Sequence, residues 1–211
     1  MSAPISQGGS QTIDGLIRQK IRKAGPGTVF TPTSFLKLGG RAAVDKVLSR
    51  LTSEGIVRRM ARGLYDVPQT HPQLGPLPPS IDAVAKALAG RHGIRLQPSG
   101  AYAANMLRLS EQVPAKVTFL TDGPSRKVKI GNQEITLKQA APRFLGAVGR
   151  TSGLVIEALR YLGKENVNPL RIGHLRTLLS AADKSGLIED LHLAPAWMHP
   201  HLRFIAGDAK A

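Results

Sequence analysis

The segment that most restricts the fold is residues 68–79, in which five of the twelve positions are proline. Proline lacks a backbone N–H group and disfavours a helix before it, so this run cannot lie inside a helix. We therefore predict a stiff, extended linker over residues 68–79. It would separate an N-terminal domain at residues 12–67 from a C-terminal domain at residues 80–211. Residues 1–11 are expected to be disordered.

Three helical segments are predicted before this linker. Thr12 can cap a helix that runs to about residue 24, because isoleucines recur every fourth position along it. Thr31 and Pro32 begin a second, short helix that ends near Leu38. The glycine pair 39–40 then makes a tight turn into a third helix over residues 41–54. The predicted buried seam of the third helix consists of Val44, Val47, Leu48 and Leu51.

Two short strands are predicted directly after the third helix. Residues 56–60 and 63–67 alternate or cluster apolar side chains, and the turn Ala61-Arg62-Gly63 joins them. A helix, a tight turn, a second helix and a two-stranded wing, in this order, are the parts of a winged helix-turn-helix. We therefore predict a winged helix-turn-helix domain at residues 12–67.

A helix of this kind fits the major groove of DNA and reads bases near its N-terminal end. Arg41 is therefore the best candidate for a base contact, and Lys46 and Arg50 can reach bases or phosphates. The remaining candidates for phosphate or minor-groove contacts are the hydroxyls of Thr31, Thr33 and Ser34 and the wing residues Arg58, Arg59 and Arg62. Two other interpretations stay open, because winged helices also bind proteins and basic helix faces are often only solvated.

The net charge supports a polyanionic partner. The chain has 29 basic and 14 acidic residues, a net charge of +15. Residues 1–70 and 86–150 hold most of this excess, whereas residues 151–211 are nearly neutral. Nucleic acid is the partner that such a balance favours. The aromatic content of 4% argues against a stacking platform for single strands.

The C-terminal domain is predicted to be a larger unit of helices and a small antiparallel sheet, so the fold class is mixed α+β. The turn pair Gly131-Asn132 indicates a two-residue β-hairpin. A helix beginning at Pro169 is expected to end near Ala182, and the tail around Trp197 is expected to pack irregularly. The other expected strands cover residues 94–97, 116–121, 126–130 and 133–137. The other expected helices cover residues 81–89, 101–107 and, within a generally helical region 151–191, residues 154–162.

One of these strands, residues 126–130, is strongly basic on one side. Lys127 and Lys129 share a face and Val128 and Ile130 the opposite one. Such a strand is either a sheet edge protected by lysine or a surface that faces phosphates. The candidate residues for a second DNA-binding or other functional surface are Arg108, Lys116, Arg126, Lys127 and Lys129.

No pattern of an enzyme is present, so we expect no catalytic residues, no cofactor and no metal. The sequence has neither a phosphate-binding loop nor a nucleophile elbow, and it has no cysteine. His192, His199 and His201 are separated by prolines, which favours packing roles over a metal site. Neither a transmembrane helix nor a signal peptide is apparent, and we expect a cytoplasmic protein without membrane contact.

Two groups of motifs resemble the AbiEi-type antitoxins. The first group, similar to the winged-helix domain of that family, comprises residues 41–51, 55–59 and 62–65. The second group, similar to its second domain, comprises residues 98–105, 113–116 and 120–126. The resemblance covers about residues 12–145. Gly40 departs from it, because a hydroxyl side chain is common at that helix cap.

The resemblance implies an antitoxin of a bacterial toxin–antitoxin system linked to abortive phage infection. Such a protein represses its own operon by binding inverted repeats in the promoter DNA through the winged helix. Its functional partner is a nucleotidyltransferase toxin, without a stable complex, and its second domain acts in antitoxicity. Matching positions assign DNA contacts to Arg41, Lys46, Arg50 and the wing arginines. Two alternatives are a stand-alone winged-helix regulator and an interaction protein whose second domain binds protein or RNA.

Overall fold

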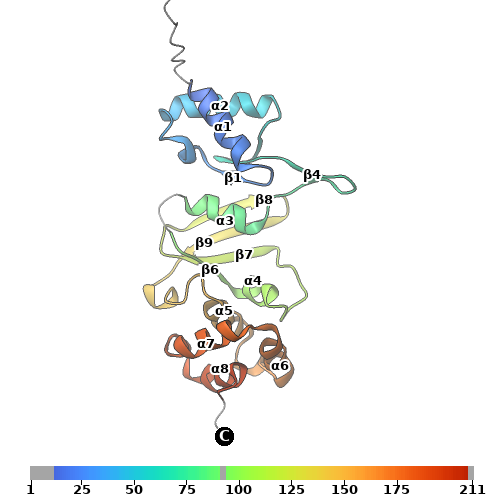
Figure 1. Ribbon diagram of the computed structural model, residues 1–211, viewed down its shortest axis with the longest axis vertical. Helices are drawn as coiled ribbons and strands as arrows, with labels where there is room; N and C mark the ends of the chain where they lie inside the picture. Colours follow the sequence, from blue (N-terminus) through green and yellow to red (C-terminus); the bar gives the residue numbers. More distant parts are fainter. Residues whose placement is uncertain (1–11, 91–93, 209–211) are drawn as a thin grey trace, which may run out of the picture. The chain divides into compact units, whose positions relative to one another are not determined.

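A computed structural model describes residues 12–90 and 94–208 of the chain, which has a mixed α+β fold (Figure 1). The expected disordered segment 1–11 lies outside the described residues. The chain divides into two compact units, one ending at Gly90 and the other beginning at Arg91. The boundary therefore lies after the helix that the sequence analysis assigned to the C-terminal domain. No helix of the described residues is long and apolar enough to cross a membrane.

The first unit contains helices, short strands and a projecting hairpin. Thr12 caps the first helix by accepting a hydrogen bond from the Gly15 amide, as predicted. The elements in chain order are α1 (Ile13–Ala24), β1 (Val29–Phe30), the 3₁₀-helix η1 (Pro32–Phe35), α2 (Arg41–Ser53), β2 (Arg58–Ala61), β3 (Leu64–Asp66), β4 (Gln69–His71), β5 (Gly75–Leu77) and α3 (Ile81–Ala89).

The core of the first unit lies between α1, α2 and a three-stranded sheet of order β1-β3-β2. The predicted seam of α2 is confirmed, since its four apolar residues are buried. Phe30 meets the edge of the Phe35 ring at 5.1 Å and stacks on Tyr65 at 6.2 Å. These aromatic contacts join β1, η1 and β3 in one cluster.

The structure corrects two predictions for the first unit. The proline-rich segment is not a single extended linker, because β4 and β5 pair antiparallel with Thr70 opposite Pro76. Proline is tolerated in this exposed two-stranded ladder, where no further strand needs its missing N–H group. The predicted second helix is only the four-residue η1. The helix ends at Phe35 instead of near Leu38, and the chain then turns toward Gly40.

The second unit joins a four-stranded sheet to a group of helices. Its elements in chain order are β6 (Leu96–Ser99), α4 (Gly100–Met106), β7 (Lys116–Thr121), β8 (Arg126–Ile130), β9 (Gln133–Gln139), η2 (Pro142–Phe144), α5 (Thr151–Leu162), η3 (Lys164–Asn166), α6 (Pro169–Leu178), α7 (Ala181–Glu189), η4 (Leu191–Leu193), η5 (Ala196–Met198) and α8 (His199–Ala206). Buried residues of α4 to α8 form its largest apolar cluster.

The sheet of the second unit has the order β6-β7-β9-β8. The two-residue hairpin is confirmed, with Ile130 opposite Gln133 and Gly131 at a φ of +57°. The expectation of a purely antiparallel sheet is wrong, because β7 and β9 run parallel. The hairpin places β8 at the sheet edge and leaves β9 beside β7.

Two further predictions about the helices are wrong. The run from Pro169 to Ala182 is two helices, because Ser180 caps α7 and forms a reciprocal capping box with Asp183. The tail is not irregular, since residues 199–206 form α8. Its inward residues Leu202 and Ile205 are fully buried, as a helix with an apolar side toward the core requires.

Helix α5 approaches its neighbours closely at Gly153. A Cβ atom there would lie 2.4 Å from the Ala147 carbonyl oxygen and 2.7 Å from the Gln97 Oε1 atom. Gln97 is buried, and its Oε1 atom has no hydrogen-bond partner among the described residues. Residue 153 must therefore lack a side chain for α5 to pack at this position.

We predict that Gly153→Ala destabilises the protein by about 1–3 kcal/mol, because backbone would have to move to admit the methyl group. Gly186→Ala in α7 is the matched control, since a Cβ atom there has nothing within 4 Å. The free energy of unfolding of the control should stay unchanged or rise by up to about 1 kcal/mol, because alanine favours a helix more than glycine does. Urea unfolding measures both, and equal stability of the two variants would contradict the packing argument.

Candidate nucleic-acid interface

Helix α2 exposes basic residues opposite its buried seam. Arg41 is its first residue, and Lys46 and Arg50 follow on the exposed side. The N-cap residue Gly40 provides no side-chain hydrogen bond to the helix. Because the apolar seam fixes the rotation of the helix, these basic side chains are directed away from the core.

Arg41 and Lys46 are the two basic residues of α2 that form no ion pair with another described element. The Arg41 Nε atom lies 2.7 Å from the Asp45 Oδ2 atom, one helical turn away. Both side chains are exposed, and such a pair contributes little stability, so a phosphate or a base can displace it. Lys46 forms no ion pair with any described residue.

Arg50 belongs to an ion-pair network that joins α1 to the end of α2. Arg18 binds Asp14 at 2.9 Å and Glu54 at 2.7 Å, while Arg50 binds Asp14 and lies 3.9 Å from Glu54. The positive charges of the two arginines therefore balance the negative charges of the two carboxylates. This arrangement gives Arg50 a role in holding the two helices together, which the sequence analysis did not foresee.

Arg58 is likewise bound within the protein. Its Nε and Nη2 atoms donate to the two Asp66 carboxylate oxygens at 3.1 and 2.6 Å, and Nη2 also donates to the Leu77 carbonyl oxygen. Asp66 is 1% exposed. The hydrogen bonds from Arg58 to this carboxylate raise the pKa of Arg58. Arg58 therefore joins β2 to β3 and to the end of β5.

The other two arginines of this sheet are exposed. Arg59 lies opposite Tyr65 on β2, and Arg62 lies in the turn before Gly63, which has a φ of +71°. Neither forms an ion pair with a described residue. We call Arg41, Lys46, Arg59 and Arg62 the open cations of the first unit.

The three hydroxyl residues of the candidate site shape η1 locally. The Thr31 and Thr33 hydroxyls are 2.6 Å apart, and the Ser34 hydroxyl accepts from the Thr31 amide at 3.4 Å. Thr31 is largely buried, whereas Thr33 is exposed. Lys20 reinforces the turn by donating to the Ser34 carbonyl oxygen at 2.8 Å. Thr33 is thus the hydroxyl that an external phosphate reaches most easily.

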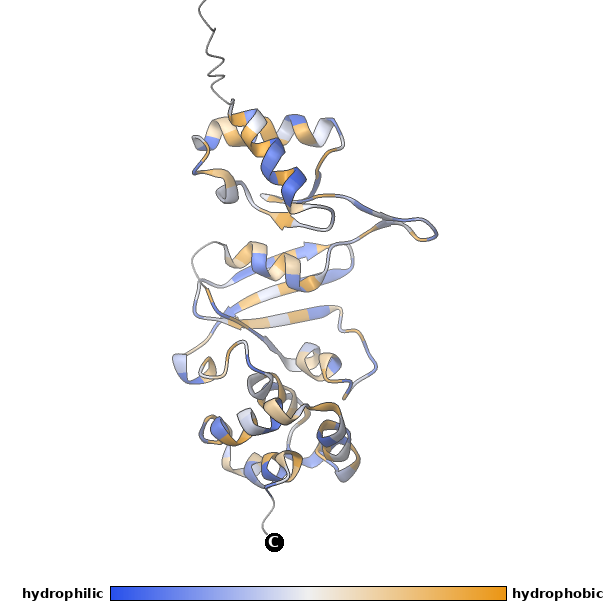
Figure 2. Ribbon diagram, in the orientation of Figure 1, coloured by the Kyte–Doolittle hydropathy of each residue, from blue (hydrophilic) through white to orange (hydrophobic). Residues whose placement is uncertain are grey.

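A second cationic surface lies on one face of the sheet in the second unit. Strand register places Lys116 beside Glu134 and Glu134 beside Lys129 in one row across β7, β9 and β8. The next rows contain Lys127 and Lys138, and polar and apolar residues alternate along these strands (Figure 2). We call Lys116, Lys127, Lys129 and Lys138 the sheet lysines; all four are exposed.

One carboxylate lies among these lysines. Glu134 accepts from Lys127 at 2.7 Å, and this hydrogen bond, with the charges of Lys116 and Lys129, holds the pKa of Glu134 below its ordinary value. Three lysines around one carboxylate, with Lys138 further along the same face, leave this face positive. An approaching phosphate would find a surface that is only partly neutralised.

The remaining candidates of the second unit lie elsewhere. Arg126 alternates to the opposite face of β8 and pairs with Leu137 on β9. Arg108 follows the end of α4 with a positive φ of 56°. Lys138 was not among the residues expected from the sequence, because the predicted strand ended at residue 137, whereas β9 extends to Gln139. Alternation from Glu134 through Thr136 was the available signal.

Acidic and histidine residues of the second unit also have protein partners. Asp122 accepts from the Arg95 side chain at 2.9 Å and from its amide at 2.8 Å, and these bonds lower the pKa of Asp122. His192 and His199 lie 3.1 and 3.0 Å from carbonyl oxygens of Glu189 and Ala194. In the described part of the chain, no group of three or more acidic or histidine side chains could hold a metal.

We predict that Arg58→Ala lowers the free energy of unfolding by about 2 kcal/mol, because it leaves the buried Asp66 carboxylate unpaired. The value falls below that for fully buried pairs because 37% of the Arg58 side chain is exposed. The neighbouring control, Arg59→Ala, should stay within about 0.5 kcal/mol of the wild type. Denaturant unfolding compares the two, and equal losses would contradict the assigned roles.

We also predict that acid weakens the link between α1 and α2. Hydrogen bonds from Arg18 and Arg50 hold the pKa of Asp14 below 3.8, and the bond from Arg18 holds that of Glu54 below 4.5. Because these pKa values are lowered on folding, the stabilisation is present above about pH 5 and is lost as the pH falls through them.

Unfolding of the wild type and Glu54→Gln at about pH 6 and about pH 3 measures this effect. The wild type should be the more stable protein at the higher pH, and the difference should shrink at the lower pH. A difference that is unchanged or grows in acid would contradict the ion-pair assignment.

Comparison with known proteins gives one family match. A family model described as a family of unknown function (DUF6088) matches residues 16–187, which span most of both units. No curated protein matches the chain.

Proposed function

The chain belongs to the DUF6088 family of unknown function, and we propose that it is a DNA-binding repressor that acts through its first unit. The observation that carries this proposal is the sorting of basic residues in that unit. Arg58 is bound to the buried Asp66 carboxylate, and Arg50 joins two helices through the partly exposed Asp14 carboxylate. The open cations on α2 and on the strands that follow it join no described elements; they face solvent, and Arg41 alone among them has a partner in the described chain, the exposed Asp45 of its own helix.

In this proposal the first unit works as a winged helix-turn-helix. Helix α2 enters the major groove, where Arg41 near its N-terminal end contacts a base and Lys46 contacts a base or a phosphate. The turn between β2 and β3 is the wing, which brings Arg59 and Arg62 to phosphates or to the adjacent minor groove. Thr33 adds a hydroxyl to the phosphate contacts.

The resemblance to AbiEi-type antitoxins extends the proposal to a biological role. The chain would be a cytoplasmic antitoxin that represses its own operon at inverted repeats, opposite a nucleotidyltransferase toxin with which it forms no stable complex. The sheet lysines would contact more phosphates or serve antitoxicity. The alternative is a stand-alone regulator. Co-expression with a nucleotidyltransferase encoded beside it distinguishes the two roles, because only an antitoxin should restore the growth of cells that express the toxin.

The DNA-binding proposal is tested by titrating the full chain against its own upstream duplex and a scrambled duplex. With six to ten phosphate contacts, affinity should fall by roughly 10³–10⁵ between about 50 and 200 mM salt. The upstream duplex should also bind more tightly than the scrambled one. Equal affinity for both duplexes would contradict a sequence-specific repressor, and a flat response to salt would contradict phosphate binding.

We predict that Arg41→Ala and Arg62→Ala have different effects. Loss of a base contact by Arg41→Ala should cost about 1–3 kcal/mol on the specific duplex and relax the preference at one base pair. Arg62→Ala should weaken specific and scrambled duplexes equally, because phosphates are the same in both. Fluorescence anisotropy with both duplexes measures this. If Arg41→Ala, like Arg62→Ala, loses equal affinity for the specific and the scrambled duplex, Arg41 is a phosphate contact.

We predict that the double variant Lys116→Ala/Lys129→Ala lowers affinity for both duplexes and reduces the salt slope by about two, as removal of two phosphate contacts requires. The control Lys184→Ala removes a lysine of α7, away from the sheet. An unchanged slope in the double variant would show that the sheet lysines are not used for DNA.

A further inference from the structure

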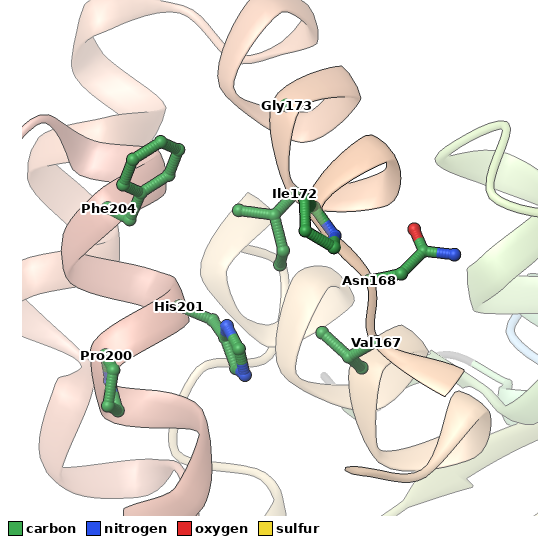
Figure 3. Close-up of a pocket in the computed structure, with 8 residues that line it drawn as sticks. Val167, Asn168, Ile172, Gly173, Pro200, His201 and Phe204 are labelled. Atoms are coloured by element: carbon green, nitrogen blue, oxygen red, sulfur yellow. The ribbon is translucent and has the colours of Figure 1, made fainter. Parts of the chain in front are cut away.

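A hollow in the second unit is not used by the proposed DNA-binding function. It has a volume of about 420 Å³ and lies between the start of α6 and the helix α8. Figure 3 shows Val167 and Ile172 on one side, and Phe204, Pro200 and His201 on the other. Pockets of this size, with mostly apolar walls and few polar groups, are typical of small-molecule sites.

A glycine lines this hollow. Gly173 lies in the middle of α6, and a Cβ atom on it would meet nothing within 4 Å. Glycine is a poor helix former, so a larger residue would favour the helix. Packing therefore does not require a glycine here, and a larger side chain at this position would have room to occupy part of the hollow.

His201 and Asn168 are the polar side chains that line the hollow, and the Asn168 Oδ1 atom already accepts a hydrogen bond from the Arg171 amide at 3.0 Å. His201 extends from α8 into the space beside Val167 (Figure 3) and contacts the edge of the Trp197 ring at 6.4 Å. The Arg176 guanidinium lies over the Phe204 ring at 4.9 Å. Within the described part of the chain, His201 has no hydrogen-bond acceptor and Arg176 has no carboxylate partner. No lining residue is acidic.

We propose that this hollow binds a small carboxylic acid with an apolar aromatic or branched body. The body would pack between Ile172 and Phe204, where it removes apolar surface from water. The carboxylate would accept a hydrogen bond from His201, and the Arg176 guanidinium over the Phe204 ring would add a favourable positive charge near the site. The charge of the site selects an acid over a cation or a neutral analogue, and the site is independent of the DNA-binding proposal.

The direct test uses phenylacetate and its neutral amide, phenylacetamide, with the ¹⁵N-labelled full chain. Phenylacetate should produce saturable shifts of the Gly173 and Phe204 amide signals and bind about tenfold more tightly than the amide, as loss of one charge-assisted hydrogen bond requires. Equal binding of the two probes would overturn the assignment of an acid. Shifts elsewhere only, or none for phenylacetate, would overturn the site.

Two variants locate the binding. Gly173→Leu should fill the hollow and abolish the shifts, whereas Gly186→Leu in α7, where a Cβ atom is equally free, should leave them unchanged. His201→Phe keeps a ring of similar size and should remove the preference for the acid over the amide. Thermal unfolding confirms that each variant is folded, and a folded Gly173→Leu that still binds phenylacetate overturns the proposal.

An acidic peptide with apolar residues is the third probe. A partner protein could place a carboxylate and an apolar side chain in the same hollow, and the peptide tests for such an occupant. If such a peptide shifts the Gly173 and Phe204 signals and phenylacetate does not, the occupant is a macromolecule and the small-acid proposal is overturned. If phenylacetate competes with the peptide for these signals, the small-acid site is supported.

Discussion

The buried carboxylate of Asp66 is the constraint on which the sheet of the first unit depends. A carboxylate that is 1% exposed must be paired, and Arg58 supplies two hydrogen bonds to it while also binding the Leu77 carbonyl oxygen. One guanidinium thus fixes β2, β3 and the end of β5 together. With Arg58 used in this way, the outward residues of the same hairpin, Arg59 and Arg62, are left for an external anion. The α1–α2 network uses Arg50 similarly and leaves Arg41 and Lys46.

Much of the first unit could be predicted from the sequence because its signals are local. Apolar spacing, the Thr12 cap and glycine turns correctly placed α1, α2 and the two strands after α2. The length of η1 could not be predicted, because the turn after Phe35 depends on aromatic packing with Phe30. Asp14, to which Arg50 donates, lies 36 residues away, and Asp66, the partner of Arg58, lies 8 residues away, so neither of these two ion pairs has a local pattern. Charge alone therefore overstated the number of basic residues available to DNA.

In the second unit, the strands and the hairpin were predictable, but the sheet order was not. Parallel pairing of β7 with β9 joins segments whose relation depends on the whole sheet, and this pairing brings Lys116 beside Glu134, on the face that holds Lys127 and Lys129. Of the two roles left open for β8, its edge position is established, and contact with phosphate remains a proposal. The division of residues 169–189 into two helices depended on the Ser180–Asp183 capping box, which competes with the apolar pattern of one long helix.

The central claim is that ion pairs between elements of the first unit divide its arginines into structural and DNA-facing groups. The most direct measurement is the NMR spectrum of arginine Nε–H groups in the full chain, recorded with and without the upstream duplex. The account predicts that the Arg41 and Arg62 signals shift on binding, while the Arg58 signal, held by Asp66, does not. A large shift of the Arg58 signal with unchanged Arg41 and Arg62 signals would contradict it.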